Sequence, residues 1–254
     1  MCNRNEQKAI INDMALYLIK DRRKYLPREG GRKLYKSILP DLISNNINIG
    51  RDKLFDLLRE NKLLVRPKKR YVHTTNSRHR FRKYPNLIKE MKITKPNQVW
   101  VSDITYISLF KGHCYLALVT DAYSRKIVGY DISDSLELEC CLRALKRALR
   151  QLSADHKLIH HSDRGVQYCS YAYVNLLKKN KARISMTEEN HCYENAIAER
   201  VNGILKDEFY LDQSFINIKE AKCSGKSAIN LYNHRRLHLS LNYKTPDMVH
   251  KSVA

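Results

Sequence analysis

The chain has 254 residues, of which 43% are hydrophobic, so it is long enough and apolar enough for a buried core and is not a wholly disordered protein. Its 47 Lys and Arg residues outnumber its 26 Asp and Glu residues, and the net charge of +21 favours a polyanionic partner such as nucleic acid. Residues 1–95 hold 25 basic and 9 acidic residues, so this part is expected to bind the polyanion. A basic protein without a specific partner, or one associated with ribosomes, is the alternative.

The cysteines and the apolar runs indicate a cytoplasmic protein. The seven cysteines are odd in number and no two are spaced as C-x-x-C, which favours reduced thiols. No secretion signal precedes them, and no apolar run reaches the ~18 residues that a membrane helix needs. We therefore expect no membrane partner.

Residues 1–65 are predicted to form a helical, helix-turn-helix-like DNA-binding segment. Apolar residues recur at helical spacing over residues 6–26, 32–45 and 51–61. The third helix is basic and follows a short turn, and its expected buried side is Leu54, Phe55, Leu57 and Leu58. Its candidate DNA-binding residues are Arg51 and Lys53, with Arg59 and Lys62 beside them. A small helical bundle whose charged face is only solvated fits the same pattern.

Residues 66–95 are predicted to be a basic linker. Positive charge is dense from Arg66 to Arg70 and from Arg78 to Lys83, and no apolar periodicity is visible. Such a segment could follow a DNA backbone and become ordered on binding, or it could be a flexible tether.

From residue 96 the pattern changes to that of an α/β domain. β-Branched and aromatic residues predict strands over residues 99–107, 114–121 and 126–132, which short turns would join into an antiparallel meander. Further strands are expected at 157–161 and 183–186. Helices are expected at 136–152, 170–180, 194–209 and 218–235. Residues 96–254 should therefore form a mixed sheet of about five strands with flanking helices.

Three acidic residues stand in settings that predict a metal site. Asp103 lies in the first strand among apolar residues, where a carboxylate is costly unless it meets a partner or a metal ion. Asp163 directly follows the strand 157–161, and ligands usually bind at the carboxyl ends of strands. Glu199 lies in the helix 194–209. The 35 residues between Asp163 and Glu199 are weak support on their own, because chance gives such pairs too.

Helical periodicity adds neighbours to Glu199. Asn195, Glu199, Asn202 and Lys206 fall on one side of the helix 194–209, opposite its apolar residues. We expect the apolar side to pack on the sheet and this polar stripe to be presented next to the carboxylates. An ordinary exposed lysine is the alternative role for Lys206.

Carboxylates that converge at one end of a sheet would hold two divalent metal ions. Mg²⁺ prefers oxygen ligands, so we expect two Mg²⁺ ions, with Mn²⁺ as a substitute. Two such ions can activate an attacking water or 3′-hydroxyl and stabilise the leaving oxygen of a phosphodiester. That is the chemistry of cutting and joining DNA strands, and it needs no organic cofactor.

The strings around these acids carry a family resemblance. They are WVSDITY at residues 100–106, HSDRGVQY at 161–168 and ENAIAER at 194–200, with YNHRRLH at 232–238 and Thr245-Pro246 near the end. They resemble the retroviral-integrase-like DDE core, and more closely the second-frame (OrfB) product of the IS-three family of bacterial insertion sequences. The similarity runs from about Gln98 to Val249, and residues 30–85 more weakly resemble the helical segment that precedes the core in that family.

The resemblance implies an RNase H-like fold for residues 96–254, Mg²⁺ dependence and strand transfer of the element's ends by a DNA transposase. It places a basic residue seven positions after the triad Glu, which is Lys206, and implies that Lys206 holds a phosphate of the terminal DNA. The implied partners are double-stranded DNA (insertion-sequence ends and target), further copies of the chain and an upstream first-frame product. That product usually carries a leucine zipper, and no sustained heptads occur in this chain.

Other residues have weaker assignments. Arg164, Tyr168 and Asn195 are candidate DNA-binding residues, with a surface salt bridge for Arg164 and a packed ring for Tyr168 as alternatives. Asp121 is expected to be structural, pairing with Arg125. The cluster Asn233-His234-Arg235-Arg236 either lies near the active site or ends a helix.

Two other functions fit the same chemistry or charge. An RNase H-like nuclease would cut RNA–DNA hybrids with the same carboxylates. A catalytically decayed DNA-binding protein, such as a repressor left by a dead element, would keep the basic segment without the chemistry.

Overall fold

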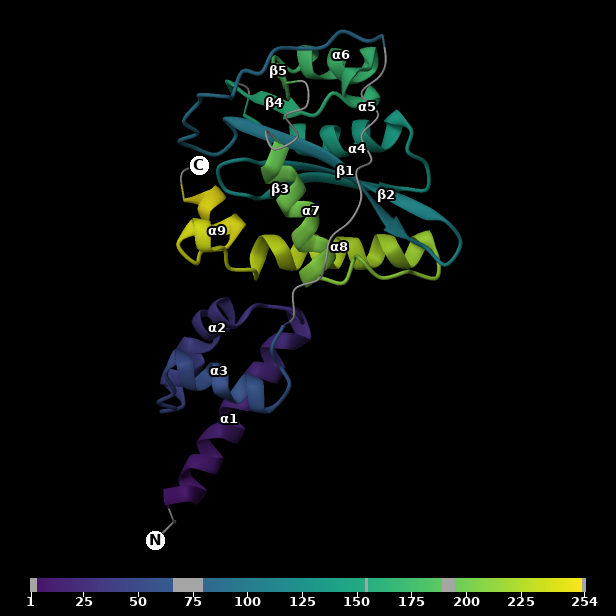
Figure 1. Cartoon of the computed structure of the whole chain (residues 1–254). Coiled ribbons are helices and arrows are strands. Elements are labelled where there is room, and N and C mark those ends of the chain that lie inside the picture. The colour runs from purple at the N-terminus through teal and green to yellow at the C-terminus, as the bar shows by residue number, and fades with distance from the viewer. Residues whose placement is uncertain (1–3, 66–79, 154, 189–194, 253–254) are drawn as a thin grey trace.

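A computed structural model describes residues 4–65, 80–153, 155–188 and 195–252. It has a small helical unit followed by a larger α/β domain (Figure 1). None of the helices in these ranges is long and apolar enough to cross a membrane.

The expectation of reduced thiols is confirmed for the cysteines that the structure describes. The free thiols are Cys114, Cys140, Cys141, Cys169 and Cys223. Cys2 and Cys192 lie outside the described residues.

The helical unit contains the three predicted helices. They are α1 (Arg4–Tyr25), α2 (Gly31–Ser44) and α3 (Arg51–Glu60). Leu54, Leu57 and Leu58 of α3 are buried as expected, against residues of α1 and α2. Phe55 is only half-buried and lies across Gly31, where an added Cβ would come within 2.7 Å of the ring.

The first half of α1 is less buried than its apolar spacing predicts. Ile10 is 54% exposed and Met14 is 40% exposed, whereas Ala15 and Ile19 are fully buried in the small core. The reason is visible in Figure 1, where the amino-terminal turns of α1 extend beyond α2 and α3.

The α/β domain is built on the predicted five-stranded mixed sheet. Its strands are β1 (Val99–Ser108), β2 (His113–Asp121), β3 (Ile127–Ser133), β4 (Ile159–Ser162) and β5 (Arg183–Met186). The order is β3-β2-β1-β4-β5, with β1, β2 and β3 pairing antiparallel as a meander. β4 and β5 are parallel to β1, which brings the carboxyl end of β4 to the side of β1 that carries Ser102 and Asp103.

Helices cover both faces of this sheet. They are α4 (Leu138–Leu149), α5 (Val166–Cys169), α6 (Tyr171–Lys179), α7 (Ala196–Glu208), α8 (Ile218–His234) and α9 (Pro246–Lys251). Alternate residues of β2 point to opposite faces. Ala117 and Val119 pack in the core with α4 to α6, and Leu116 and Leu118 pack in the core with α7 and α8.

Part of the predicted linker belongs to the α/β domain. Phe81 and Tyr84 pack against the core beneath α4 to α6, and the stretch 87–93 packs against β1 and β4. The Leu87 amide also donates to Ser185 Oγ at 2.9 Å. Residues 81–93 of the predicted linker therefore pack on the α/β domain and do not form a free tether, while 66–79 lie outside the described residues. This burial could not be predicted from the sequence, because the backbone here is irregular and its apolar residues follow neither helical nor strand spacing.

The contact of α4 with β3 depends on Gly129. A Cβ there would lie 2.8 Å from the Ala148 Cβ and closer still to the Ala144 carbonyl oxygen. We expect Gly129→Ala to lower the free energy of unfolding by about 1–3 kcal/mol, because overpacking forces the helix off the strand. Chemical denaturation measures this change. Gly50→Ala is the control, since a Cβ at Gly50 meets nothing within 4 Å and its cost should stay below about 1 kcal/mol. Equal losses in both variants would contradict the packing explanation.

The helical unit is docked on the α/β domain by buried charges. Lys33 Nζ of α2 donates to Glu208 at the end of α7 (2.8 Å), and Arg236 Nη2 donates to the same carboxylate (2.6 Å). Arg22 Nη2 donates to the Arg235 carbonyl oxygen (2.8 Å), and Leu26 packs in the core of α7 and α8. We call the Lys33–Glu208–Arg236 group the charged joint.

Candidate active site

Asp103 lies in the middle of β1 and is tied to α7. Its Oδ1 accepts a hydrogen bond from the Ile104 amide (2.9 Å), and its Oδ2 accepts one from Asn202 Nδ2 (2.8 Å). Burial and the negative charge of Asp163, with a smaller contribution from Glu199, raise the pKa of Asp103 to about 7. The charges of Asp163 and Glu199 therefore both act on the Asp103 carboxyl group.

Asp163 and Glu199 are placed by the elements that the sequence predicts. Asp163 directly follows β4, and its Oδ1 accepts from the Gly165 amide at 2.9 Å. A Cβ at Gly165 would lie 2.9 Å from that same oxygen, so a side chain here would displace the carboxylate. Glu199 is exposed in the first turn of α7. Nevertheless, no three His, Cys, Asp or Glu side chains in the described ranges form a group that could hold a metal ion.

Two amides of the predicted polar stripe of α7 are buried against β1, whereas Glu199 of the same stripe is exposed and the apolar residues of α7 pack in the core as expected. Asn195 is 3% exposed and donates to the Ser102 carbonyl oxygen (3.1 Å), and Asn202 is 5% exposed and holds Asp103. The amides take the positions next to β1 because a buried carboxylate and a free carbonyl need donors there. With its amide bonded to Ser102, the buried Asn195 supports β1, and the structure gives it no open surface for DNA.

Lys206 lies on the same stripe and remains close to the carboxylates. Its ammonium group sits 4.1 Å from the centre of the Tyr106 ring. Burial lowers the pKa of Lys206, and the charge of Asp103 opposes that shift. The side chain is half-buried, so it differs from an ordinary exposed helix lysine.

Two other candidates differ in their surroundings. Tyr168 is 3% exposed, and its ring packs edge-on against Tyr173 at 5.3 Å, so it is a core residue and the expectation of a DNA contact is wrong. Tyr168 lies in the one-turn helix α5, and its ring points into the core that α4 and α6 cover. Arg164 is half-buried, and its Nε donates to the Thr187 carbonyl oxygen (2.7 Å).

The candidate DNA-binding residues of α3 belong to the helical unit, which lies away from β1 and β4 in Figure 1. Arg51 is exposed and its Nε donates to Asp52 (2.9 Å), and Lys53 is half-buried. Arg51 and Arg59 line a shallow groove together with Arg32 of α2.

The remaining polar residues have structural roles. Asp121 is fully buried and accepts from Ser124 and from the Asn97 amide, so its predicted structural role is confirmed. The expected pairing with the Arg125 side chain is wrong, because Arg125 Nη1 has no hydrogen-bond partner among the described residues. Asn233 of α8 exchanges hydrogen bonds with the backbone of Ile127, and Arg236 belongs to the charged joint. The cluster of residues 233–236 therefore ends α8 and stabilises the fold.

Asn202 was predicted to lie on the polar stripe with Glu199, but no role was predicted for it. A second buried group lies nearby: His160 Nε2 is 2.8 Å from Ser102 Oγ and 3.0 Å from Tyr173 Oη. Both groups hold the part of β1 that carries Asp103. The available signal for Asn202 was its spacing: it lies three positions after Glu199, so the two side chains are neighbours on one helix face.

We expect Asn202→Ala to raise the Mg²⁺ concentration for half-maximal strand transfer by about 10–100-fold, because the Asp103 oxygen loses the donor that orients it. Titration of Mg²⁺ in a strand-transfer assay measures this shift. Asn230→Ala on the exposed side of α8 is the matched control. An unchanged Mg²⁺ requirement with a slower maximal rate would argue against the positioning role.

The fold belongs to the RNase H-like class of the integrase cores. This class is defined by the strand order of the sheet, by helices on both of its faces, and by carboxylates on β1, after β4 and on α7. Two regions match family models described as integrase core domain, residues 93–192 and 180–246. Among solved structures, the simian T-cell lymphotropic virus intasome in complex with the PP2A regulatory subunit B56 gamma shares the fold. The TM-score is 0.55 at 17% identity, over 80% of this chain and 68% of that one.

Relatives narrow the class to a family. The insertion element IS600 31 kDa protein of Shigella sonnei is 38% identical over 208 residues, which cover 81% of this chain and 76% of that protein. The transposase for insertion sequence element IS629 of Shigella sonnei is 34% identical, and the match spans 71% of this chain and 61% of the longer relative. The chain belongs to the family of insertion-sequence transposases with an integrase core domain.

Proposed function

We propose that this chain cleaves and joins DNA phosphodiesters at the ends of an insertion sequence, with Asp103, Asp163 and Glu199 as its catalytic and metal-binding triad. The observation that carries the proposal is the parallel pairing of β1 and β4, which sets Ser102 opposite Ser162 and so brings Asp163 close to Asp103, where its charge raises the pKa of Asp103. Folding to place like charges together is unfavourable unless a cation offsets them. Membership of the transposase family supplies the reaction class.

The residues fit divalent metal ions by their chemistry. All three side chains offer carboxylate oxygens, which suit Mg²⁺, and Mn²⁺ is the expected substitute. A pair of such ions would activate the attacking hydroxyl and stabilise the leaving oxygen. Asn202 fixes the Asp103 carboxylate by its 2.8 Å hydrogen bond, and Asn195 fixes the adjoining Ser102 backbone.

Positive side chains around the triad would bind the DNA. Lys206 lies on the face of α7 that carries Glu199 and would hold a phosphate of the terminal DNA, where the charge of Asp103 already acts on it. Arg164 follows Asp163 and would contact the same strand. Arg51 and Lys53 of α3 would contact double-stranded DNA farther from the cut. Joining two ends favours a homo-oligomer on DNA, with an upstream first-frame product as a further partner.

A strand-transfer assay tests the proposal against its two alternatives. Duplexes with the terminal repeats that flank the gene are incubated with target DNA and Mg²⁺, in parallel with an RNA–DNA hybrid. We expect joined product that EDTA abolishes, and an intact hybrid. Hybrid cleavage without joining would favour the nuclease. DNA binding without metal-dependent cutting or joining would favour the catalytically decayed protein.

A further inference from the structure

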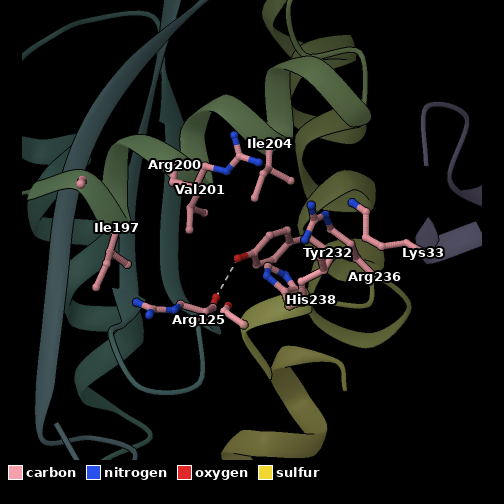
Figure 2. A pocket seen from close by; sticks show the side chains of 12 residues that line it. Lys33, Arg125, Ile197, Arg200, Val201, Ile204, Tyr232, Arg236 and His238 are labelled. Atoms are coloured by element: carbon pink, nitrogen blue, oxygen red, sulfur yellow. Dashed lines mark hydrogen bonds between the residues drawn. The ribbon is translucent and has the colours of Figure 1, made fainter. Parts of the chain in front are cut away.

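A basic pocket lies beside α7, between that helix and residues at and after the end of α8 (Figure 2). Ile197 and Arg200 line it, and at 100° per residue they are roughly 140° and 160° around the helix from Asn202. The pocket has a volume of about 360 Å³. Its polar lining consists mainly of Lys33, Arg125, Arg200, Tyr232, Arg236 and His238, and the described lining includes no carboxylate.

The four cations of this pocket exceed the acids that neutralise them. Lys33 and Arg236 share the single carboxylate of Glu208 in the charged joint. Arg125 and Arg200 form no ion pair with any residue of the described ranges, and Arg125 Nη1 is buried there without a hydrogen-bond acceptor. Such unused donors in a low-dielectric pocket are costly unless an anion binds them.

His238 adds an independent sign of a ligand. Its side chain is 6% exposed, and its Nε2 has no hydrogen-bond partner among the described residues. Burial and the charges of Arg236, Lys33, Arg125 and Arg200 lower the pKa of His238 to about 2. The ring is therefore neutral at physiological pH, and Nε2 remains able to bond a ligand in the pocket. Because four cations act on one imidazole, the pocket has a strongly positive electrostatic potential.

We propose that the basic pocket binds a phosphate group of the DNA backbone, with Arg125 and Arg200 as the principal ligands. Arginine suits phosphate because its planar guanidinium donates two parallel hydrogen bonds. The exposed Arg200 would meet the strand at the opening, and the half-buried Arg125 would complete the site.

The choice of DNA rests on the proposed function. Glu199 and Arg200 are consecutive, so the triad and the basic pocket flank one helix about 10 Å across, a distance of about three nucleotides of one strand. A strand that crosses α7 could thus be held on both sides. A free nucleotide carries the same phosphate chemistry, and the apolar Ile197 and Val201 could contact its base, so the test separates the two sources.

Salt-dependent DNA binding tests this site without strand transfer. A fluorescein-labelled duplex is titrated with the full chain at several salt concentrations in the absence of Mg²⁺. The double variant Arg125→Gln/Arg200→Gln should show a slope of log affinity against log salt that is smaller by about 0.9, the contribution of one phosphate. The control Arg150→Gln/Arg183→Gln removes two exposed arginines elsewhere and should keep a steeper slope than the pocket variant. An unchanged slope in the pocket variant would overturn the proposal.

Two further measurements distinguish a DNA phosphate from a free nucleotide as the ligand of the basic pocket. A neutral methylphosphonate at successive linkages of the duplex should identify one linkage that weakens binding of the unmodified chain, and no such position would count against the site. Deoxyadenosine monophosphate should not bind measurably. Nucleotide binding that the pocket variant loses, with an unchanged DNA slope, would assign the pocket to a free nucleotide. Asp163→Asn should bind with the original slope even though it cannot join DNA, so failure of the triad and failure of this site are distinguishable.

Discussion

Replacing any triad carboxylate by its amide should lower the rate of strand transfer by about 10³-fold or more. The variants are Asp103→Asn, Asp163→Asn and Glu199→Gln, which keep the shape of the side chain but remove its charge. Each would lose a proposed metal ligand whose contribution to the transition state is several kcal/mol, and about 4 kcal/mol corresponds to this loss of rate. Joined product on a denaturing gel measures the rate, and fluorescence anisotropy measures DNA binding, which should be preserved.

The control for this series is Asp134→Asn, which removes an exposed acid after β3. It should transfer strands at the original rate. Transfer within tenfold of the original in one amide variant would remove that residue from the triad. Because Asp163 raises the pKa of Asp103, Asp163→Asn should also make Asp103 more acidic, which a structural change at β4 would not do by itself.

The catalytic part of the fold could be predicted because its signals are local. A run of β-branched residues around Asp103 specifies β1, and a short apolar run before Asp163 specifies β4. Once both strands are parallel neighbours, Asp103 and Asp163 come close together, and the amphipathic helix α7 carries Glu199 in its first turn.

The parts that could not be predicted depend on contacts between distant segments. The burial of Asn202 was not predicted because it depends on the hydrogen bond to Asp103, which is 99 positions away, and periodicity treats an asparagine as a surface residue. Tyr168 has the same difficulty, since its packing against Tyr173 depends on a turn that a single motif does not reveal. Lys33 and Glu208 are 175 positions apart, so the charged joint has no local signature.

The charged joint leads to the largest expected effect on stability. In Glu208→Gln, the buried Lys33 and Arg236 would face each other without their carboxylate. Removing one partner from a buried ion group costs about 3–5 kcal/mol, because the remaining charges stay desolvated. We expect that loss in the free energy of unfolding, together with faster hydrogen exchange in α2, since Lys33 connects α2 to α7. Thermal unfolding and amide exchange by mass spectrometry measure both.

The dependence of this loss on pH separates charge from packing. Burial alone would raise the pKa of Glu208, but hydrogen bonds and charges from Arg236 and Lys33 outweigh it, so the pKa is lowered. A lowered folded-state pKa stabilises the fold above the unfolded pKa, and this contribution disappears as the pH falls through the folded value. The difference between the original chain and Glu208→Gln should therefore be full at neutral pH and shrink in acid. Asp52→Asn, which breaks the exposed pair with Arg51, should cost less than about 1 kcal/mol at any pH. An equal loss from Glu208→Gln in acid and at neutral pH would show that the joint acts through shape, and the helical unit would then be held mainly by Leu26 in the core of α7 and α8.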